Sequence, residues 1–176
     1  TIIEEVAKIA TETFPDDIDI RVDVPDDLND IVGDATQVQQ VLMNLCVNAR
    51  DAMKDGGLIE ITASSAEVTE EAAHRNIEAK SGTYVCLTVR DTGTGIPDEA
   101  IDKIFEPFFS TKAEGEGTGL GLSTAYSIVK SHNGFVDVES EAQKGTVFRV
   151  YLPVATSSDR RRGPIGSGAL RDGQGE

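Results

Sequence analysis

The chain has few of the residues that mark a disulfide framework, a membrane span or a surface for polyanions. It holds only 2 Cys and 2 His, and no Trp. Two cysteines cannot form a disulfide framework, which favours a reducing compartment, and no apolar run approaches the ~20 residues of a membrane span. The net charge of −15, from 16 Lys and Arg against 31 Asp and Glu, excludes a basic surface for nucleic acid or anionic lipid. We expect a cytoplasmic domain without a nucleic-acid partner or direct membrane contact, whether or not the full-length protein is membrane-anchored.

The 176 residues are enough for one domain with a core, because 39% of them are hydrophobic. Charge and glycine content divide the chain near residue 155. Residues 1–154 hold 12 basic and 28 acidic residues, whereas residues 155–176 hold five glycines, three consecutive arginines and no periodic apolar face. We expect a folded domain over 1–154 and a flexible linker or tail over 155–176. Because the chain begins with Thr, we expect it to be a piece of a longer protein.

Hydrophobic spacing predicts alternating helices and strands along the folded part. The predicted helices cover residues 2–14, 35–54, a short turn after Pro97, and 119–131. The predicted strands cover residues 18–24, 58–65, 83–90, 135–140 and 145–152. Residues 66–82 are polar and are expected to form an irregular surface excursion. The elements lack βαβ regularity and predict an α+β, two-layer α/β sandwich, in which helices cover one face of a mixed, mostly antiparallel sheet.

The helix predicted over 35–54 carries a polar stripe. Asn44, Asn48 and Asp51 are spaced by four and three residues, so they lie on one side of the helix beside an apolar face. Asn is a mediocre helix former, so two of them one turn apart in an apolar helix call for an explanation. From the helix alone, a solvent-facing stripe and a ligand-binding stripe explain the pattern equally well.

Two glycine-containing segments indicate a ligand. In the first, Asp91 ends a predicted strand before Gly93, Gly95 and Ile96, so its carboxylate can accept a hydrogen bond from an exocyclic amine; an ordinary turn also explains this segment. In the second, three alternating glycines lead into a predicted helix, where exposed backbone N–H groups favour an anion such as phosphate over a plain flexible loop. The residues of this second segment are Gly117, Thr118, Gly119, Leu120, Gly121 and Leu122.

Three familiar nucleotide-binding patterns are absent from the sequence. No Gly-Lys pair occurs, which excludes the P-loop, and position 98 is Asp, which removes the third glycine of the dinucleotide fingerprint. The catalytic-loop triplet of protein kinases is also missing. Cys46 and Cys86 are expected in the core, because two thiols without a local His do not make a zinc site.

The order of the segments resembles the ATP-binding catalytic domain of bacterial sensor histidine kinases. That domain belongs to the GHKL superfamily, or Bergerat fold, with DNA gyrase, the heat-shock chaperone ATPase and mismatch-repair ATPases. Five boxes carry the resemblance: residues 44–51 are similar to the N box, 91–95 to the first glycine box, 105–112 to the F box, 117–121 to the second glycine box and 144–153 to the closing strands. Five boxes in the right order over residues 1–154 make it highly specific.

The resemblance implies roles at both ends of an ATP molecule. Asn48 would hold Mg²⁺ through its side-chain oxygen, and Asn44 would lie beside the phosphates. Asp91 would recognise the adenine amine, and Thr146 would help to close the adenine site. The glycine-flanked turn would let the backbone approach the base, through Gly93, Gly95 and Ile96.

The resemblance also implies an ATP lid over residues 105–118. Backbone N–H groups in the second glycine box and the first helical residues after it, Gly117 to Leu122, would hold phosphate. Lys112 would direct positive charge to phosphate, although a solvated lid lysine explains it equally well. Asp51 is a further candidate at the nucleotide, but Arg50 and Asp51 depart from the common N box, and which of them contacts the nucleotide stays open.

Only two histidines are present, His74 and His132, and neither lies in the family's phosphoacceptor motif. The resemblance therefore implies that the acceptor histidine lies on a separate dimerisation domain before residue 1, with a response regulator or receiver domain downstream. We expect the ATP-binding catalytic domain of a two-component sensor histidine kinase, which donates the γ-phosphoryl of Mg-ATP to that histidine. The alternatives are a gyrase- or chaperone-like ATPase, an anti-sigma-type serine kinase and a non-catalytic, nucleotide-responsive interaction module.

Overall fold

The computed structural model describes residues 2–28, 31, 33–75, 80–109 and 120–155. These residues form a five-stranded sheet with the order β1-β2-β3-β5-β4. The strands are β1 (Ile18–Asp23), β2 (Gly57–Val68), β3 (Gly82–Asp91), β4 (Phe135–Glu141) and β5 (Gly145–Pro153). β1 and β2 are parallel and all other neighbours are antiparallel, which confirms the predicted mixed, mostly antiparallel sheet.

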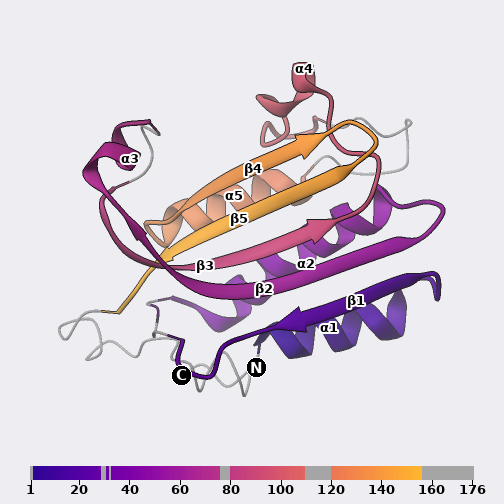
Figure 1. Ribbon diagram of the computed structural model, residues 1–176, viewed down its shortest axis with the longest axis horizontal. Helices are drawn as coiled ribbons and strands as arrows, with labels where there is room; N and C mark the ends of the chain where they lie inside the picture. Colours follow the sequence, from indigo (N-terminus) through magenta and orange to yellow (C-terminus); the bar gives the residue numbers. More distant parts are fainter. Residues whose placement is uncertain (1, 29–30, 32, 76–79, 110–119, 156–176) are drawn as a thin grey trace.

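Three helices cover one face of this sheet (Figure 1). They are α1 (Ile2–Thr13), α2 (Ala35–Asp51) and α5 (Gly121–Ser131), while α3 (Glu70–Arg75) and α4 (Asp98–Ile101) are short helices outside this layer. α2 packs against both α1 and α5 and therefore forms the centre of the helical layer. The predicted two-layer α+β sandwich is confirmed. Within the described ranges, no helix combines the length and the apolar character needed to cross a membrane.

The core lies between the sheet and the helices. Alternate residues of the central strands point toward the helical layer and are buried, because successive side chains of a strand face opposite sides. These buried strand residues are Ile59, Ile61, Val85, Leu87, Val89, Phe148, Val150 and Leu152. Removing apolar surface from water contributes about 25 cal/mol per Å², so this layer is the main source of stability.

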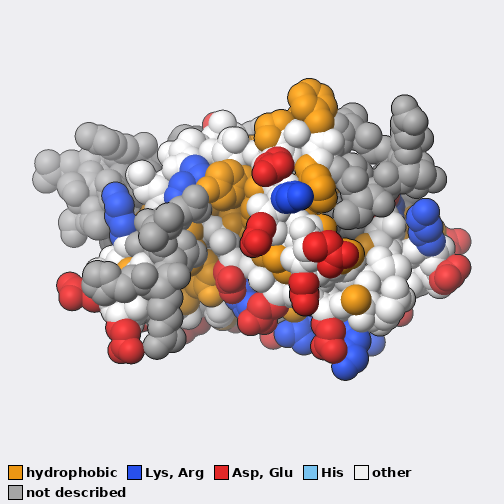
Figure 2. Space-filling model, turned by 90° about the horizontal axis from the view of Figure 1, so that it is seen from above, with side chains coloured by type: hydrophobic (Ala, Val, Ile, Leu, Met, Phe, Trp, Pro, Cys, Tyr) orange, Lys and Arg blue, Asp and Glu red, His pale blue; other side chains and the backbone are white. Residues whose placement is uncertain are grey.

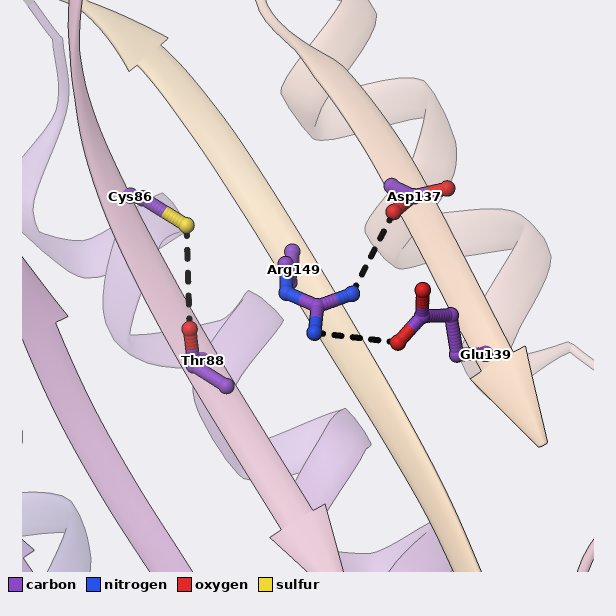
Figure 3. A network of polar contacts seen from close by, with 5 residues as sticks. All are labelled: Cys86, Thr88, Asp137, Glu139 and Arg149. Atoms are coloured by element: carbon purple, nitrogen blue, oxygen red, sulfur yellow. Dashed lines mark hydrogen bonds and ion pairs between the residues drawn. The ribbon is translucent and has the colours of Figure 1, made fainter. Parts of the chain in front are cut away.

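The opposite face of the sheet is lined by polar contacts between and along strands (Figure 3). Arg149 of β5 pairs with Asp137 at 3.4 Å and with Glu139 at 3.0 Å, and both carboxylates come from β4. On β3, the Sγ atom of Cys86 lies 3.6 Å from the hydroxyl of Thr88. Such pairs between neighbouring strands stabilise a sheet whose second face is left open by the helices.

Both long helices at the start of the chain follow the predicted pattern, with small errors. In α1, Ile2, Ile3 and Val6 are fully buried. Ile9 is 39% exposed because it lies at the edge of the helix face that packs on the core. α2 is capped by Asp34, whose carboxylate accepts the backbone N–H groups of residues 36 and 37. α2 ends at Asp51 rather than at residue 54, because the chain turns there toward β2.

One further prediction about the strands was wrong. Residues 66–82 are not irregular throughout: β2 continues to Val68 and is followed by α3, because β2 pairs with β3 without interruption as far as Gly82. The predicted lack of βαβ regularity holds, since only β1 and β2 of the described strands are parallel, with α2 connecting them. Of the helix predicted over 119–131, residue 119 lies outside the described residues, and α5 begins at Gly121.

Candidate functional site

The asparagines of α2 lie on the side of the helix next to α5. Asn44 and Asn48 are half-buried, while Leu45 and Ala49 on the neighbouring side are buried in the core. The side-chain amide of Asn44 donates from Nδ2 to the backbone carbonyl of Gly121 at 3.0 Å. A carbonyl oxygen accepts only, so this contact assigns the amide orientation and turns Oδ1 of Asn44 away from it. The N-box helix and the start of α5 are thus joined directly.

The N-terminus of α5 is formed by Leu120 and Gly121. Its N-cap residue Leu120 is aliphatic and makes no side-chain capping bond, and its carbonyl oxygen accepts the backbone N–H of Thr124 and the hydroxyl of Ser123. At Gly121 an added Cβ would meet no described atom within 4 Å, so the glycine is not required by packing. Backbone N–H groups at a helix start lie at the positive end of the helix dipole, where an anion binds favourably.

Asp91 ends β3 as a buried carboxylate, with 4% of its surface exposed. Its Oδ1 accepts the backbone N–H of Gly93 at 2.8 Å, and the backbone N–H of Thr146 also donates to it. Burial raises the pKa of Asp91 above its ordinary value, and these two hydrogen bonds oppose the rise. In the part of the chain that the structure describes, no cationic side chain pairs with Asp91. The carboxylate is therefore suited to accept a hydrogen bond from a neutral amine.

The turn after Asp91 is held between α2 and the β4–β5 turn. The backbone N–H of Thr94 donates to the carbonyl oxygen of Ala52 at 3.0 Å, and its carbonyl oxygen accepts the N–H of Gln143 at 2.6 Å. A Cβ at Gly93 would lie 2.5 Å from the same carbonyl of Ala52, and a Cβ at Gly95 would collide with the backbone at residue 141. Both glycines are thus required by the protein's own backbone, apart from any approach to a base.

Arg50 and Asp51 form a pair beside α1. The Nε and Nη2 atoms of Arg50 lie 3.1 and 3.0 Å from the same Oδ1 of Asp51. The guanidinium of Arg50 also lies 5.1 Å from the centre of the Phe14 ring, a cation–π distance. The structure therefore gives Arg50 a packing role toward the end of α1, and a contact of Asp51 with a nucleotide stays a prediction.

The structure brings two groups of the predicted site residues together. One group is Asn44 with Gly121 at the α2–α5 junction, and the other is Asp91 with Thr146, which are directly paired across β3 and β5. Ile96 and Leu122 are half-buried on the elements that adjoin these groups. Four predicted residues lie outside the described residues: Lys112, Gly117, Thr118 and Gly119.

Ser140 was missed by the sequence analysis. Its hydroxyl oxygen lies 2.8 Å from the hydroxyl of Thr146 and accepts the backbone N–H of Ile96 at 2.6 Å. The signal was present in the strand period, because Ser140 follows Val136 and Val138 at steps of two. It is therefore a polar residue on the core face of β4, where an apolar one would be expected.

The surface beside the site is acidic. Figure 2 views the molecule from the side of β4 and α4 and shows acidic side chains at several places across this face. The exposed acidic residues on these elements include Asp98, Glu99, Glu139 and Glu141. The surrounding field therefore does not attract a polyanion, and an anionic ligand needs local donors or a bound cation.

These elements define an ATP-binding domain with the Bergerat fold, as the sequence predicted. Residues 33–156 match the family described as Histidine kinase-, DNA gyrase B-, and HSP90-like ATPase, and the chain belongs to this family. The matched residues include the N-box helix, both glycine boxes and the closing strands.

Curated relatives of the chain are sensor kinases. The sensor kinase CckA of Brucella abortus (strain 2308) is 45% identical over 137 residues, which are 78% of this chain and 14% of CckA. The sensor histidine kinase ZraS of Escherichia coli (strain K12) is 39% identical over 138 residues, which are 78% of this chain and 26% of ZraS. The chain therefore spans about a quarter or less of the length of these relatives.

Solved structures agree with this assignment. The catalytic domain of the histidine kinase ThkA has a TM-score of 0.66 at 34% identity, covering 87% of this chain and 90% of that chain. Full-length ShkA, solved in complex with AMPPNP, has a TM-score of 0.70 at 29% identity, covering 89% of this chain and 30% of that chain. The domain is thus the ATP-binding catalytic domain of the histidine-kinase type, and the gyrase-like, serine-kinase and non-catalytic alternatives are not favoured.

Proposed function

We propose that the domain works in the cytoplasm within a two-component sensor histidine kinase, where it binds Mg-ATP and donates the γ-phosphoryl to a histidine. That histidine lies on a separate dimerisation domain of the same protein, and a response regulator or receiver domain takes the phosphoryl next. Sensor-kinase relatives at 45% and 39% identity support this proposal. So does the likeness to ShkA, which was solved with the nucleotide AMPPNP.

The buried carboxylate of Asp91 is the observation that carries the proposal. Gly93 and Thr146 hold it with backbone N–H groups, and no described cation neutralises it. A carboxylate has about four lone-pair sites, so Asp91 can accept a further hydrogen bond beyond these two, and a hydrogen bond to a charged acceptor is worth about 1.5–3 kcal/mol. The exocyclic amine of adenine is such a donor. Gly95 and Ile96 continue the same turn and are proposed to lie beside the base.

We propose that the phosphate groups of ATP bind at the junction of α2 and α5. Asn44 is held there by its bond to the Gly121 carbonyl, so its side chain is positioned before any ligand binds. The proposed phosphate ligands beyond it are the backbone N–H groups from Gly117 to Leu122 together with Lys112. Phosphoryl transfer depends mainly on positioning and charge stabilisation, which we propose the α2–α5 helix pair and a lid over residues 105–118 to provide.

Asn48 is proposed to hold the Mg²⁺ ion. In the described ranges, no group of three or more His, Cys, Asp or Glu side chains is arranged to coordinate a metal ion. The amide oxygen of Asn48, half-buried one turn after Asn44, fits an arrangement that Mg²⁺ uses, with few protein oxygens completed by phosphates and water. When bound, the ion neutralises charge on the triphosphate, which this acidic domain cannot do by its own field.

Calorimetric titration with ATP, with and without Mg²⁺, tests the binding half of the proposal. We expect saturable binding that weakens strongly when EDTA removes the ion. Asn48→Ala should lose most of this Mg²⁺ dependence, whereas Gln40→Ala, an exposed change on the same helix, should leave it unchanged. Absence of saturable ATP binding in the folded chain would overturn the proposal.

Phosphoryl transfer is tested by adding a dimerisation domain that carries a candidate acceptor histidine. We expect radiolabel from [γ-³²P]ATP to appear on that domain as an acid-labile, base-stable product, which is the signature of phosphohistidine. An acid-stable product would instead support a serine kinase. ATP binding without transfer to any tested acceptor domain would support the non-catalytic interaction module.

A further inference from the structure

The hydroxyl of Ser140 joins three segments next to the buried carboxylate. Ser140 lies near the end of β4 and is half-buried. Its oxygen accepts the backbone N–H of Ile96 at 2.6 Å, lies 2.8 Å from the hydroxyl oxygen of Thr146, and lies 3.1 Å from the carbonyl oxygen of Gly145. One side chain thus connects the turn after Asp91 to both strands of the closing hairpin.

The three partners determine where the protons lie. A serine hydroxyl has one proton and two lone pairs, the carbonyl of Gly145 can only accept, and the N–H of Ile96 can only donate. All three contacts become hydrogen bonds if Ser140 donates to Gly145 and accepts from both Ile96 and Thr146. If Ser140 donated to Thr146 instead, its contact with Gly145 would place two acceptors against each other. The fully bonded arrangement therefore directs the proton of Thr146 toward Ser140.

This arrangement makes the hydroxyl of Thr146, beside Asp91, a hydrogen-bond acceptor for a ligand. The two residues are directly paired across β3 and β5, so their side chains leave the sheet on the same face. With its proton held by Ser140, the hydroxyl of Thr146 presents lone pairs to any other neighbour. Asp91 and Thr146 then form two adjacent acceptors, and such a pair fits a donating amine and opposes an accepting carbonyl oxygen.

We infer that Ser140 is a specificity-determining residue for the purine base. It acts as a positioning residue: its bond to Ile96 fixes the turn, and it holds Thr146 as an acceptor. Through Thr146 it favours the 6-amino group of adenine over the 6-oxo group of guanine, with that edge of the base facing Asp91. The inference rests on the proposed ATP binding and adds the residue that sets base selectivity. A residue with only a structural role at this position would stabilise the turn without changing the preference for adenine over guanine.

The test compares Ser140→Ala with Ser140→Thr, which keeps the hydroxyl, and with Ser127→Ala, an exposed serine on α5. The dissociation constants for Mg-ATP and Mg-GTP and the Tm are measured for each. We expect Ser140→Ala to weaken ATP binding and to reduce the ATP-over-GTP preference about fivefold or more, since one hydrogen bond is lost and the hydroxyl of Thr146 is released to donate. Ser140→Thr should retain the preference, as should Ser127→Ala.

A double-mutant cycle with Thr146→Val shows whether Ser140 acts through Thr146. In the Thr146→Val background, Ser140→Ala should change the base preference no further. An unchanged ATP-over-GTP ratio in Ser140→Ala, with only the Tm lowered, would overturn the inference and leave the proposed function intact. If Ser140→Ala does not fold, Ser140→Cys takes its place and must shift the ratio in the same direction. Failure of the unaltered chain to bind ATP would instead overturn the proposed function itself.

Discussion

The imidazole of His132 joins the end of α5 to the start of α2. Its Nε2 atom accepts the backbone N–H of Asp34 at 3.1 Å, and its Nδ1 atom lies 2.8 Å from the carbonyl oxygen of Ile128. Because the carbonyl oxygen only accepts, a proton is assigned to Nδ1. Asn44 and Gly121 are bonded toward the other end of α5, so the two helices that carry the proposed phosphate site are tied at both ends of α5.

Two substitutions separate the roles of the two ring nitrogens of His132. Asn places its amide near the Nδ1 position and loses the bond to Asp34, whereas Gln reaches the Nε2 position. We expect His132→Asn to lower the free energy of unfolding by about 1 kcal/mol, which corresponds to a fall in Tm of about 2–4 °C. His132→Gln should lose clearly less. Thermal unfolding followed by circular dichroism measures both, and an equal or larger loss for Gln would contradict the assigned bond.

Glycines in the boxes differ in why they are required, and alanine substitutions distinguish them. Gly145 has a φ of +117°, and an added Cβ would collide with the carbonyl oxygen of Asp91. We expect Gly145→Ala to destabilise the domain by about 2–4 kcal/mol, from backbone strain and overpacking. Gly121 has open space around it, so Gly121→Ala should leave stability unchanged or raise it by up to about 1 kcal/mol.

Urea unfolding of the two alanine variants, with ATP titration alongside, separates folding from ligand binding. If Gly121→Ala keeps its stability but loses ATP affinity, the glycine is required by the ligand. Comparable destabilisation by both substitutions would contradict the packing difference between Gly121 and Gly145.

Asp91→Asn is expected to make the domain more stable and a weaker ligand binder. Burial raises the pKa of Asp91 above its ordinary value of 3.8, so the folded chain binds this proton more tightly than the unfolded chain. Stability from this group is therefore present at low pH and is lost as the pH rises through the raised pKa. Above that pKa, Asn removes a buried charge while its single oxygen can still accept from Gly93.

The free energy of unfolding of Asp91→Asn should exceed that of the unaltered chain at pH 7, and the difference should shrink as the pH falls toward 3.8. ATP affinity should fall about tenfold to a hundredfold, as expected for losing a hydrogen bond to a charged acceptor. Urea titrations across this pH range measure the first effect and calorimetry the second. A variant that is less stable at pH 7, or a gap that widens on acidification, would contradict the raised pKa.

Most of the fold was predictable from the sequence because each element carried a strong local pattern. The alternation of apolar residues from Ile18 to Val24 and the cap at Asp34 are local features, and the structure confirms both elements. The continuation of β2 to Val68 was not predictable in this way. Glu67 is exposed there, and its strand conformation depends on pairing with Thr83 of β3, which is distant in the sequence.

The site was predictable where it depends on residue type and not where it depends on tertiary contacts. Asn44 and Asp91 stand out as polar residues in apolar elements, and a strand or helix period is enough to locate them. The strand period also marks Ser140, but the contacts of Ser140 and His132 have no local signature, because their partners Ile96 and Asp34 lie 44 and 98 positions away. Only the packed structure shows that these two side chains hold the site's elements together.

Both cysteines are expected to resist alkylation while the domain is folded. Cys46 is fully buried in α2, and burial raises the pKa of its thiol to about 12. Burial also raises the pKa of Cys86, although hydrogen bonds with Thr88 and Tyr151 act in the other direction. Since the thiolate is the reactive form, iodoacetamide at pH 8 should modify either residue far more slowly than a free cysteine.

Intact-mass measurement after timed exposure to iodoacetamide checks this expectation. Ser127→Cys, on the exposed side of α5, provides an accessible thiol in the same protein and should be modified rapidly. In guanidinium chloride all cysteines should react at similar rates, because unfolding removes the burial that raises the two pKa values. Cys46→Ala and Cys86→Ala then show which thiol reacts if one does. Modification of Cys46 in the folded domain at the rate of the Ser127→Cys thiol would mean that α2, and the Asn44 and Asn48 stripe with it, opens to solvent.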